Sequence, residues 1–289
     1  MDSYEKTGYL KSDFKMFHII GQEKREFAFH YHDFHKVILF MKGDVSYVVE
    51  GCSYRLLPYD VVFIKAGEVH RPVIHSSEVY ERIIVYISPD FMEDYKNKSY
   101  DLSDCFLRAQ KESTHVLRMR TFKHSRLYDS IQDLEASFSD SEFANELYHR
   151  LLFLEFMIEL NRASIHNSIH FVANQTQNPK IRSILEYVNE HLLEDIDIEQ
   201  LAETFFISRY YLMHMFKEET GYTIGNYIST KRLLCARDFI KNGTPITEAC
   251  FMCGFNNYST FSRAYKKLFS HSASHPIKKA GPFMDPPVE

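Results

Sequence analysis

Residues 27–88 carry short runs in which apolar and polar positions alternate. The runs KVILFMKG, VSYVVEG, DVVFIKAG and RIIVYIS are rich in β-branched and aromatic residues, and Gly, Pro or Asp separates them. Several such strands at close spacing are typical of an antiparallel sandwich or small barrel. We therefore expect a β-domain over residues 1–121, with short helices and loops over 89–121.

Apolar residues at three- and four-residue spacing take over from 123 to 163, in SRLYDSIQDLEASF and EFANELYHRLLFLEFMIELNR. This period predicts two amphipathic helices, which form a helical pair over residues 122–165. In the second helix, one apolar stripe is formed by Leu147, Leu151, Leu154 and Ile158. Three further apolar residues widen it, Phe153, Phe156 and Met157. A helix this apolar needs two neighbours, one of them from a second copy of the chain. The pair is the expected dimer contact, with an intramolecular hairpin as the alternative.

Polar residues without periodicity follow at 166–180 and end in Asn-Pro, which predicts a linker. Helical patterns then fill residues 181–280. The last residues, 281–289, are expected to form a flexible tail.

The helical block is a doubled unit. In its first half Asp197 and Gln200 mark a helix start, and Ser208 caps a second helix that ends at Gly221. A long helix over roughly 224–241 leads to the second half. There Thr244 and Pro245 start a helix that breaks at Gly254, and Asn257 caps the last helix. A shift of 49 positions superimposes the halves, matching Ser208 with Asn257, Leu212 with Phe261, Phe216 with Tyr265 and Lys217 with Lys266.

The second helix of each half combines an apolar face with a face rich in hydrogen-bond donors. These outward faces hold Arg209, Tyr210, Met213, His214 and Lys217, and their counterparts Tyr258, Ser259, Ser262, Arg263 and Lys266. No Asp or Glu lies between 254 and 269, where an acid would repel phosphate. A helix that enters the DNA major groove needs these two faces. Two basic hairpins without a partner are the alternative, which the matching register of the halves disfavours.

Two stretches, IEQLAETFFISRYYLMHMFKEETGYTIGNYISTKRLLCARDFI and ITEACFMCGFNNYSTFSRAYKKLF, resemble the DNA-binding domain of AraC-type (AraC/XylS) transcription regulators. The residues that carry the resemblance are Leu201, Ala202, Ser208, Leu212, Phe216, Lys217, Gly221, Tyr227, Arg232, Leu233, Ala236, Gly254, Phe255, Phe261, Lys266 and Lys267. The chain departs from the family pattern at Ser270 and Ala273, where Gly and then Pro are usual. It departs again at Cys250 and Cys253, where aliphatic residues are more common, and both cysteines are expected to be buried.

The resemblance implies that the two helices enter successive major-groove segments on one face of double-stranded DNA. The expected base contacts are Arg209, His214 and Arg263, assisted by Tyr210, Tyr258 and Ser259. The expected phosphate contacts, which position the protein without specifying sequence, are Lys217, Lys266 and Lys267. The rest of the predicted interface is Ser208, Met213, Asn257 and Ser262. Arg232 matches a residue that is largely structural in the family.

The segments FHYHDFHKVILFMKG and LLPYDVVFIKAGEVH resemble the paired motifs of a cupin barrel, the usual sensory domain of this family. With His30 and His32 on one side of a strand and His70 approaching from the second motif, three imidazoles form a plausible metal set. Enzymatic cupins add a carboxylate where this chain has Lys36, and a cation there opposes a metal.

We therefore expect an effector pocket without metal or cofactor, lined by His30, His32, Lys36, Tyr47, His70, Arg82 and Tyr86. His35 and His75 are expected at the surface or rim. An interior filled by its own side chains is the alternative.

Charge and cysteine content fit this α+β organisation of a cupin-like antiparallel barrel, a helical pair and an all-α double helix-turn-helix domain. The net charge of −5 divides into +6 over residues 203–279 and −11 elsewhere, which indicates a polyanion-binding surface near the C-terminal end. No apolar run approaches the roughly 20 residues of a membrane span. Five cysteines without a disulfide framework favour a cytoplasmic, nucleoid-associated protein.

The sequence thus predicts a non-enzymatic, sequence-specific DNA-binding transcription regulator. It is expected to be an activator, the family's commoner mode, that acts as a homodimer and contacts RNA polymerase. A small molecule in the barrel, a sugar or an anionic metabolite, would control it. The alternatives are a metal-dependent cupin enzyme with an accessory helical domain and an effector-independent DNA-binding protein.

Overall fold

A computed structural model describes residues 10, 12–21, 27–112, 114–119, 121–139, 141–165, 169–172, 178–269 and 271–274. The chain divides into two compact units. The first is built from Tyr9–Phe27 and Phe34–Gln177, and the second from Asn178–Glu289 together with the short stretch Ala28–Asp33. No helix in the described part of the chain is both long and apolar enough to cross a membrane.

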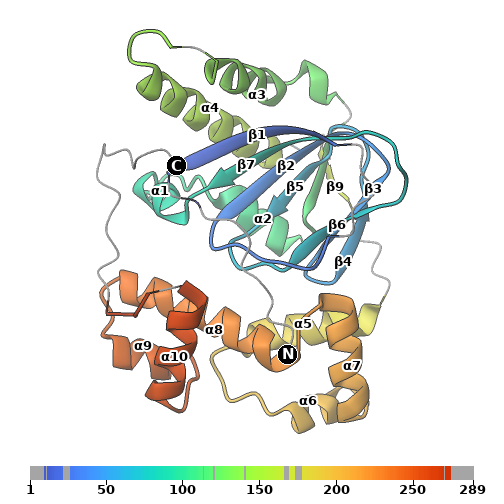
Figure 1. The fold of residues 1–289 in the computed structure, drawn as a ribbon, viewed down its shortest axis with the longest axis vertical. Helices are drawn as coiled ribbons and strands as arrows, with labels where there is room; N and C mark the ends of the chain where they lie inside the picture. Colours follow the sequence, from blue (N-terminus) through green and yellow to red (C-terminus); the bar gives the residue numbers. More distant parts are fainter. Residues whose placement is uncertain are drawn as a thin grey trace. The chain divides into compact units, whose positions relative to one another are not determined.

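The first unit contains two antiparallel sheets (Figure 1). Their strands are β1 (Phe14–Gly21), β2 (His35–Lys42), β3 (Val45–Val49), β4 (Cys52–Arg55), β5 (Val61–Ile64), β6 (His70–Ile74), β7 (Tyr80–Ile87), β8 (Val116–Met119) and β9 (Ile169–Phe171). One sheet has the order β1-β7-β2-β5-β8-β9 and the other the order β4-β3-β6. The predicted antiparallel β-domain is therefore present.

Alternation along the central strands divides their apolar side chains between two cores. In β2, Val37 and Leu39 pack on one face of the larger sheet, whereas Ile38 and Phe40 pack on the other. The second core also contains side chains of β3 and β4, so it lies between the two sheets. Because both faces of the larger sheet are covered, every residue of β2 from His35 to Phe40 is buried.

Helices cover the outer face of the larger sheet. They are α1 (Pro89–Asp94), α2 (Asp104–Lys111), a 3₁₀ turn at Phe122–His124, α3 (Arg126–Ser137) and α4 (Asn145–Ile165). Figure 1 shows α3 and α4 side by side along this face. Both contribute side chains to the first core and belong to the same compact unit as the sheets, so the expected 122–165 pair has no core of its own.

The long helix α4 is apolar on two faces. Phe153, Phe156 and Met157 are completely buried in the first core. On the outside, Leu147, Leu151, Ile158 and Ile165 are between 41% and 58% exposed. The sequence prediction that this helix needs a second neighbour therefore corresponds to an uncovered apolar face.

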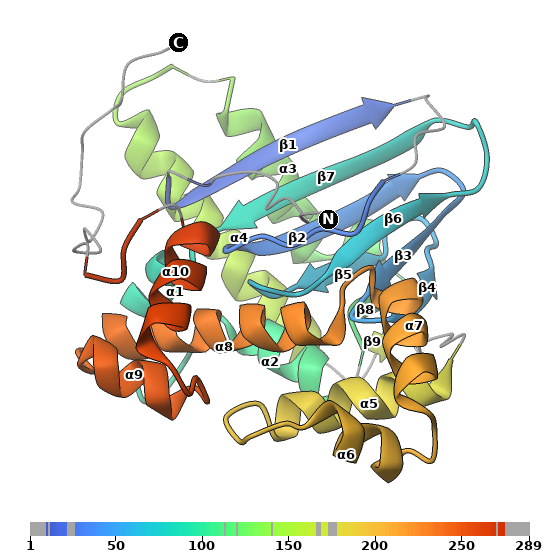
Figure 2. The ribbon, with the colours of Figure 1, turned by 60° about the horizontal axis from the view of Figure 1, so that its bottom comes forward.

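The second unit is helical. Its elements are α5 (Pro179–Glu190), α6 (Ile198–Thr204), α7 (Arg209–Thr220), α8 (Ile224–Lys241), α9 (Ile246–Met252) and α10 (Tyr258–Phe269). Figure 2 shows α8 running between the α5–α7 group at one end and the α9–α10 pair at the other. The predicted caps form: Asp197 accepts hydrogen bonds from the amides of Glu199 and Gln200, and Ser208 accepts one from Tyr211.

Several predicted local structures differ from the structure. His30 and His32 precede β2 and are separated from it by a bend at Asp33 and Phe34, so they do not lie on one regular strand. Part of the expected linker forms β9, which pairs with β8 and completes the larger sheet. Pro245, not Thr244, occupies the N-cap position of α9, and no side chain caps this helix. The expected tail at 281–289 lies outside the described residues.

Candidate DNA interface and effector site

The apolar faces of α7 and α10 attach these helices to their own halves of the second unit. Leu212 and Phe216 on α7 are completely buried, and so are their counterparts Phe261 and Tyr265 on α10. The four matched positions therefore have the same role in both halves, as the 49-residue shift predicts. Each pair holds its helix with the opposite face directed to solvent.

Nearly all of the predicted DNA-contacting side chains lie on these exposed faces. Ser262 is half-buried, and the exposed residues are Ser208, Arg209, Tyr210, Met213, His214, Lys217, Asn257, Tyr258, Ser259, Arg263, Lys266 and Lys267. Within the part of the chain that the structure describes, Lys217, Lys266 and Lys267 form no ion pair. Their charges are therefore available to phosphates.

Two of the three expected base contacts are next to acids. Arg209 Nη1 lies 2.9 Å from an oxygen of Glu199 on α6, and His214 Nδ1 lies 3.6 Å from an oxygen of Glu218 one turn along α7. Arg263 instead donates from Nε to the carbonyl oxygen of Ser259, at 3.2 Å. Glu199 was not among the predicted residues of this surface, because its contact with Arg209 joins two different helices.

The barrel interior brings together most of the predicted effector residues. Lys36 Nζ lies 3.4 Å from the hydroxyl of Tyr47 and 3.5 Å from Nε2 of His70. It also lies 5.9 Å from the centre of the Tyr86 ring. Burial, followed by the nearby charge of Arg82, lowers the pKa of Lys36 to about 7.

Strand parity directs Arg82 and Tyr86 to the inner side of β7. Tyr80 and Ile84, which share their parity, belong to the core between the sheets, and Tyr86 packs against that core. Arg82 lies with its guanidinium 4.0 Å from the centre of the Tyr80 ring. Tyr80 was not among the predicted site residues, although its alternation with Arg82 and Tyr86 placed it on the same face.

Burial keeps the surrounding tyrosines protonated. It raises the pKa of Tyr47 well above the usual value, raises that of Tyr80 to about 12, and raises that of Tyr86 above its usual value. The hydroxyls of these three residues are therefore hydrogen-bond donors at neutral pH. His35, expected at the rim, is instead buried and accepts a hydrogen bond from the amide of Ala66.

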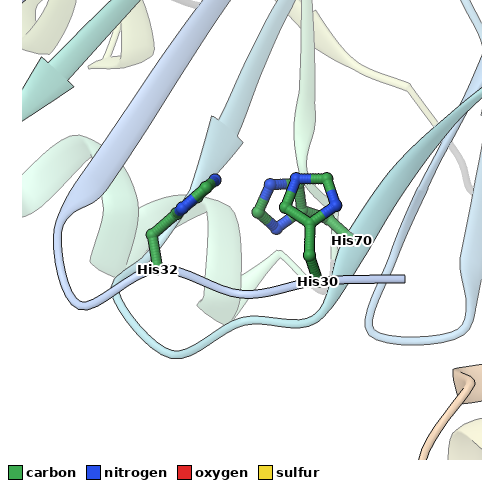
Figure 3. Close-up of side chains that lie close together, drawn as sticks. All are labelled: His30, His32 and His70. Atoms are coloured by element: carbon green, nitrogen blue, oxygen red, sulfur yellow. The ribbon is translucent and has the colours of Figure 1, made fainter. Parts of the chain in front are cut away.

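His30, His32 and His70 form a cluster whose possible ligand atoms all lie within 4.8 Å of one another (Figure 3). His70 Nδ1 donates to the carbonyl oxygen of Glu68 at 2.9 Å, so in the neutral ring Nε2 is the nitrogen that carries the lone pair. That atom faces Lys36 Nζ at 3.5 Å. When Lys36 is protonated, its ammonium competes with a metal ion for this nitrogen and repels a cation.

Comparison with known proteins matches both parts of the chain. The AraC-like ligand-binding domain matches residues 17–156, and a helix-turn-helix domain matches residues 201–278. The HTH-type transcriptional activator RhaS of Shigella sonnei is 23% identical over 252 residues, which cover 86% of each chain. RhaS of Escherichia coli strain SE11 is also 23% identical over 252 residues, again 86% of each chain.

Solved structures are similar as well. ToxT from Vibrio cholerae has 17% sequence identity, and the match covers 90% of this chain and 96% of that one with a TM-score of 0.37. The C-terminal domain of AraT, a response regulator from Geobacillus stearothermophilus, has 28% identity over 33% of this chain and 81% of that one, with a TM-score of 0.32. With a ligand-binding domain and a helix-turn-helix domain in this order, the chain belongs to the AraC/XylS family of transcription regulators.

Proposed function

We propose that this AraC-type regulator is a transcription activator that grips two successive major-groove segments and is controlled by a small molecule in its β-domain. The matched faces of α7 and α10, each anchored by a buried apolar pair, carry the DNA-binding part of this proposal. The proposal that it activates transcription follows the RhaS relatives, which are named as transcriptional activators.

The length of α8 suits this mode of binding. It has 18 residues, which corresponds to a helix about 27 Å long. Successive major-groove segments on one face of DNA lie ~34 Å apart. α7 and α10, which we call the reading helices, pack near the two ends of α8. A joining helix of this length is therefore of the right size for them to enter both segments.

Two kinds of DNA contact are proposed for the exposed faces of α7 and α10, which we call the reading faces. Arg209, His214 and Arg263 are proposed to contact base edges, and Lys217, Lys266 and Lys267 to contact phosphates. The lysines are exposed and distributed over both helices. A contact to phosphate should affect all DNA sequences alike, whereas a contact to a base edge should affect one position of the operator.

The DNA-binding proposal is tested with paired variants on a binding site selected from random DNA. Lys266→Ala should weaken binding to every sequence and reduce the salt dependence by about one phosphate contact. Arg263→Ala should relax the preference at one base pair, at a cost of about 1–3 kcal/mol. Lys180→Ala, an exposed lysine on α5, is the control. Parental affinity and specificity in both reading-face variants would exclude this face.

The β-domain is proposed to bind the effector with Lys36, Tyr47, His70, Arg82 and Tyr86, the predicted effector residues that belong to the first unit. Their donors and aromatic surfaces suit a polar or charged small molecule. The effector would shift the balance between two arrangements of the protein by its difference in affinity for them. If the protein were an effector-independent DNA binder, no metabolite would change its thermal stability or operator affinity.

A metal-dependent enzyme is the second candidate, favoured only by the His30–His32–His70 cluster. Metal analysis of the purified protein separates the two functions. Iron, manganese or zinc bound in a one-to-one ratio and lost in His32→Ala would support the enzyme. Trace amounts that do not change in this variant would support the regulator.

Assembly is proposed to be a homodimer formed through α4, which then presents two DNA-binding domains. The exposed residues Leu147, Leu151, Ile158 and Ile165 lie at spacings of four, seven and seven, as in a coiled-coil seam, while Leu154 of the predicted stripe packs partly against the first core. A second copy supplies an identical seam. As an activator the dimer would also contact RNA polymerase.

A further inference from the structure

Two cations face the interior of the β-domain. Lys36 on β2 is only 5% exposed, and it alternates with Ile38 and Phe40 of the core between the sheets. Arg82 on β7 is half-buried and shares its parity with Tyr80 and Ile84 of the same core. Both side chains therefore enter one apolar interior from neighbouring strands, which pair in antiparallel register.

Neither cation has an acid as partner among the described residues. Lys36 contacts the hydroxyl of Tyr47, Nε2 of His70 and the ring of Tyr86. Arg82 donates to the carbonyl oxygen of Tyr80 at 3.4 Å and lies over the ring of the same residue. None of these partners is an acid, and the tyrosine hydroxyls stay neutral because burial raises their pKa values.

Such an arrangement does not stabilise the fold. A buried cation without a counter-charge costs free energy, and two cations near each other cost more. This cost is reflected in the pKa of Lys36. Burial of the side chain, followed by the charge of Arg82, lowers that pKa to about 7. Uncompensated charge of this kind in an apolar interior is typical of a site for a charged ligand.

We propose that Lys36 and Arg82 hold the carboxylate group of the effector, whose apolar body lies among the aromatic side chains between the sheets. The inference rests on the proposed function, because it assigns a chemical class to the regulator's ligand. A guanidinium can donate two parallel hydrogen bonds to a carboxylate, and the lysine ammonium supplies a further charge. The Tyr47 hydroxyl, 3.4 Å from Lys36 Nζ, is placed to donate as well.

The donor set distinguishes a carboxylate from a neutral sugar. A sugar hydroxyl both donates and accepts, so a sugar site needs acceptors as well as donors. The nearby buried acids are already engaged. Glu68 accepts from the amide of Lys65 at 2.7 Å and lies 3.4 Å from His115, and Asp60 is bound by Arg118. Among the described residues no carboxylate contacts Lys36 or Arg82, so the charge that these two side chains bring to the interior matches an anion.

The experiment compares carboxylates with their own amides on the purified full-length protein. Acetate, isovalerate, phenylacetate and benzoate are each tested beside the corresponding amide by thermal unfolding and calorimetric titration. We expect at least one carboxylate to raise the melting temperature and to bind at least about tenfold more tightly than its amide, the effect of one charged hydrogen bond. Equal binding of acid and amide throughout, or no binding of any of the four carboxylates, would overturn the proposal.

Variants locate the site. Lys36→Met keeps an unbranched side chain that is one atom shorter and removes the charge, so the free protein should be as stable as the parent or more stable, while carboxylate affinity falls at least about tenfold. Lys42→Met, at the exposed end of the same strand, is the matched control and should bind like the parent. Retained affinity in Lys36→Met would contradict the assignment.

The operator-binding assay separates this inference from the proposed function. If selected DNA is bound specifically and no carboxylate binds, the ligand class is wrong and the regulator remains. If no DNA sequence is preferred, the proposed function fails, whatever the carboxylates do. Should Lys36→Met not fold, the comparison of acid and amide on the parent protein still decides the inference.

Discussion

The guanidinium of Arg232 on α8 donates from Nη1 to the carbonyl oxygen of Gly254, at 2.8 Å. From Nε the same side chain reaches the carbonyl oxygen of Leu192, also at 2.8 Å, and from Nη2 that of Glu194. One arginine on the joining helix therefore ties the loop after α5 to the turn between α9 and α10. This position of Arg232 inside the domain agrees with a structural role for it and explains its absence from the reading faces.

Gly254→Ala should destabilise the second unit. Gly254 has a φ of +77°, and a Cβ here would lie 2.8 Å from Cζ of Arg232. The left-handed backbone costs about 1–2 kcal/mol for a residue with a Cβ, and the displaced arginine adds the loss of its carbonyl contacts. We expect the free energy of unfolding, measured by urea denaturation, to fall by about 2–3 kcal/mol.

Gly225→Ala is the matched control for that measurement. Gly225 is an exposed residue in the first turn of α8, and a Cβ added there would have no neighbouring atom within 4 Å. Alanine is favoured over glycine in a helix by up to about 1 kcal/mol. This variant should be as stable as the parent or slightly more stable; equal destabilisation by both substitutions would remove the specific role of the Arg232 contact.

Glu199→Gln should strengthen DNA binding. The Glu199 carboxylate lies 2.9 Å from Arg209 Nη1 and would compete with a base or phosphate for this donor. Both side chains are more than half exposed, so the pair is worth only about 0.2–1 kcal/mol, which corresponds to an affinity gain of roughly 1.5- to 5-fold. Electrophoretic mobility shift titration at fixed salt concentration measures it.

The same charge change elsewhere controls for net charge. Glu190→Gln on α5 removes one exposed acid that forms no ion pair among the described residues. If this variant gained as much affinity as Glu199→Gln, the effect would be a general reduction of negative charge and not the release of Arg209.

Local signals predicted the helical unit well, because caps and buried faces are set by residues close in sequence. Ser208 and Asn257 cap α7 and α10 as expected, the latter by accepting from the amide of Thr260 at 3.0 Å. At α9 the prediction was one residue early. The amide of Thr244 donates to the carbonyl oxygen of Phe239, so this residue still belongs to the end of α8, and Pro245 takes the N-cap position.

The sequence pattern did not predict β1 and β9, the two edge strands of the larger sheet. β1 pairs along its whole length with β7, but none of its side chains is fully buried and the alternation is interrupted at Phe17 and His18, which are both exposed. β9 has three residues, too few for a period to be recognised, and it forms because β8 offers an unpaired edge. Both strands depend on partners distant in sequence, which a single sequence does not identify.

For the site residues too, the sequence predicted what depends on neighbouring positions but not the contacts between distant elements. Alternation along β7 puts Arg82 and Tyr86 on one face, the face whose residues Tyr80 and Ile84 belong to the core between the sheets, whereas Lys36 entered the predicted site through its place in the cupin-like motif. The neighbours that decide their chemistry come from other elements. The contact of Arg209 with Glu199 and the position of Lys36 Nζ beside His70 both require the tertiary structure.

Leu151→Glu should separate a dimer formed through α4. Leu151 is 55% exposed and lies in the middle of the outward apolar stripe. A charge at the centre of a coiled-coil seam would have to be buried without a partner in the dimer, while in a single chain it stays in water. Sedimentation velocity should show a dimer for the parent and a monomer for the variant.

Glu155→Gln serves as the control for Leu151→Glu, because this residue is exposed on the same helix outside the stripe. It should leave the sedimentation coefficient unchanged. A monomeric parent protein, or a Leu151→Glu variant that sediments as the parent does, would contradict the α4 dimer.

His18 should make the stability of the first unit depend on pH. Its Nδ1 lies 2.6 Å from an oxygen of Glu135 on α3, and its Nε2 lies 2.9 Å from an oxygen of Glu81 on β7. Burial alone would lower the pKa of His18, but the hydrogen bonds and charges of the two acids outweigh it and raise the pKa above 6.5. Protonated His18 therefore bridges β1, β7 and α3.

The sign of the pH effect follows from this raised pKa. The additional stability is fully present below about pH 6.5, where the unfolded chain is also protonated, and it is lost as the pH rises through the higher pKa of the folded protein. Because the histidine and both acids are partly exposed, the contribution should be at most about 1 kcal/mol.

Hydrogen exchange of α3 amides measures this contribution of His18 locally. Protection at about pH 6 and about pH 8, corrected for the intrinsic pH dependence of exchange, should be weaker at the higher pH. His18→Gln should abolish this difference, whereas His124→Gln, which removes an exposed histidine without an ion pair in the described structure, should retain it. A difference that persists in His18→Gln would assign the pH dependence to another group.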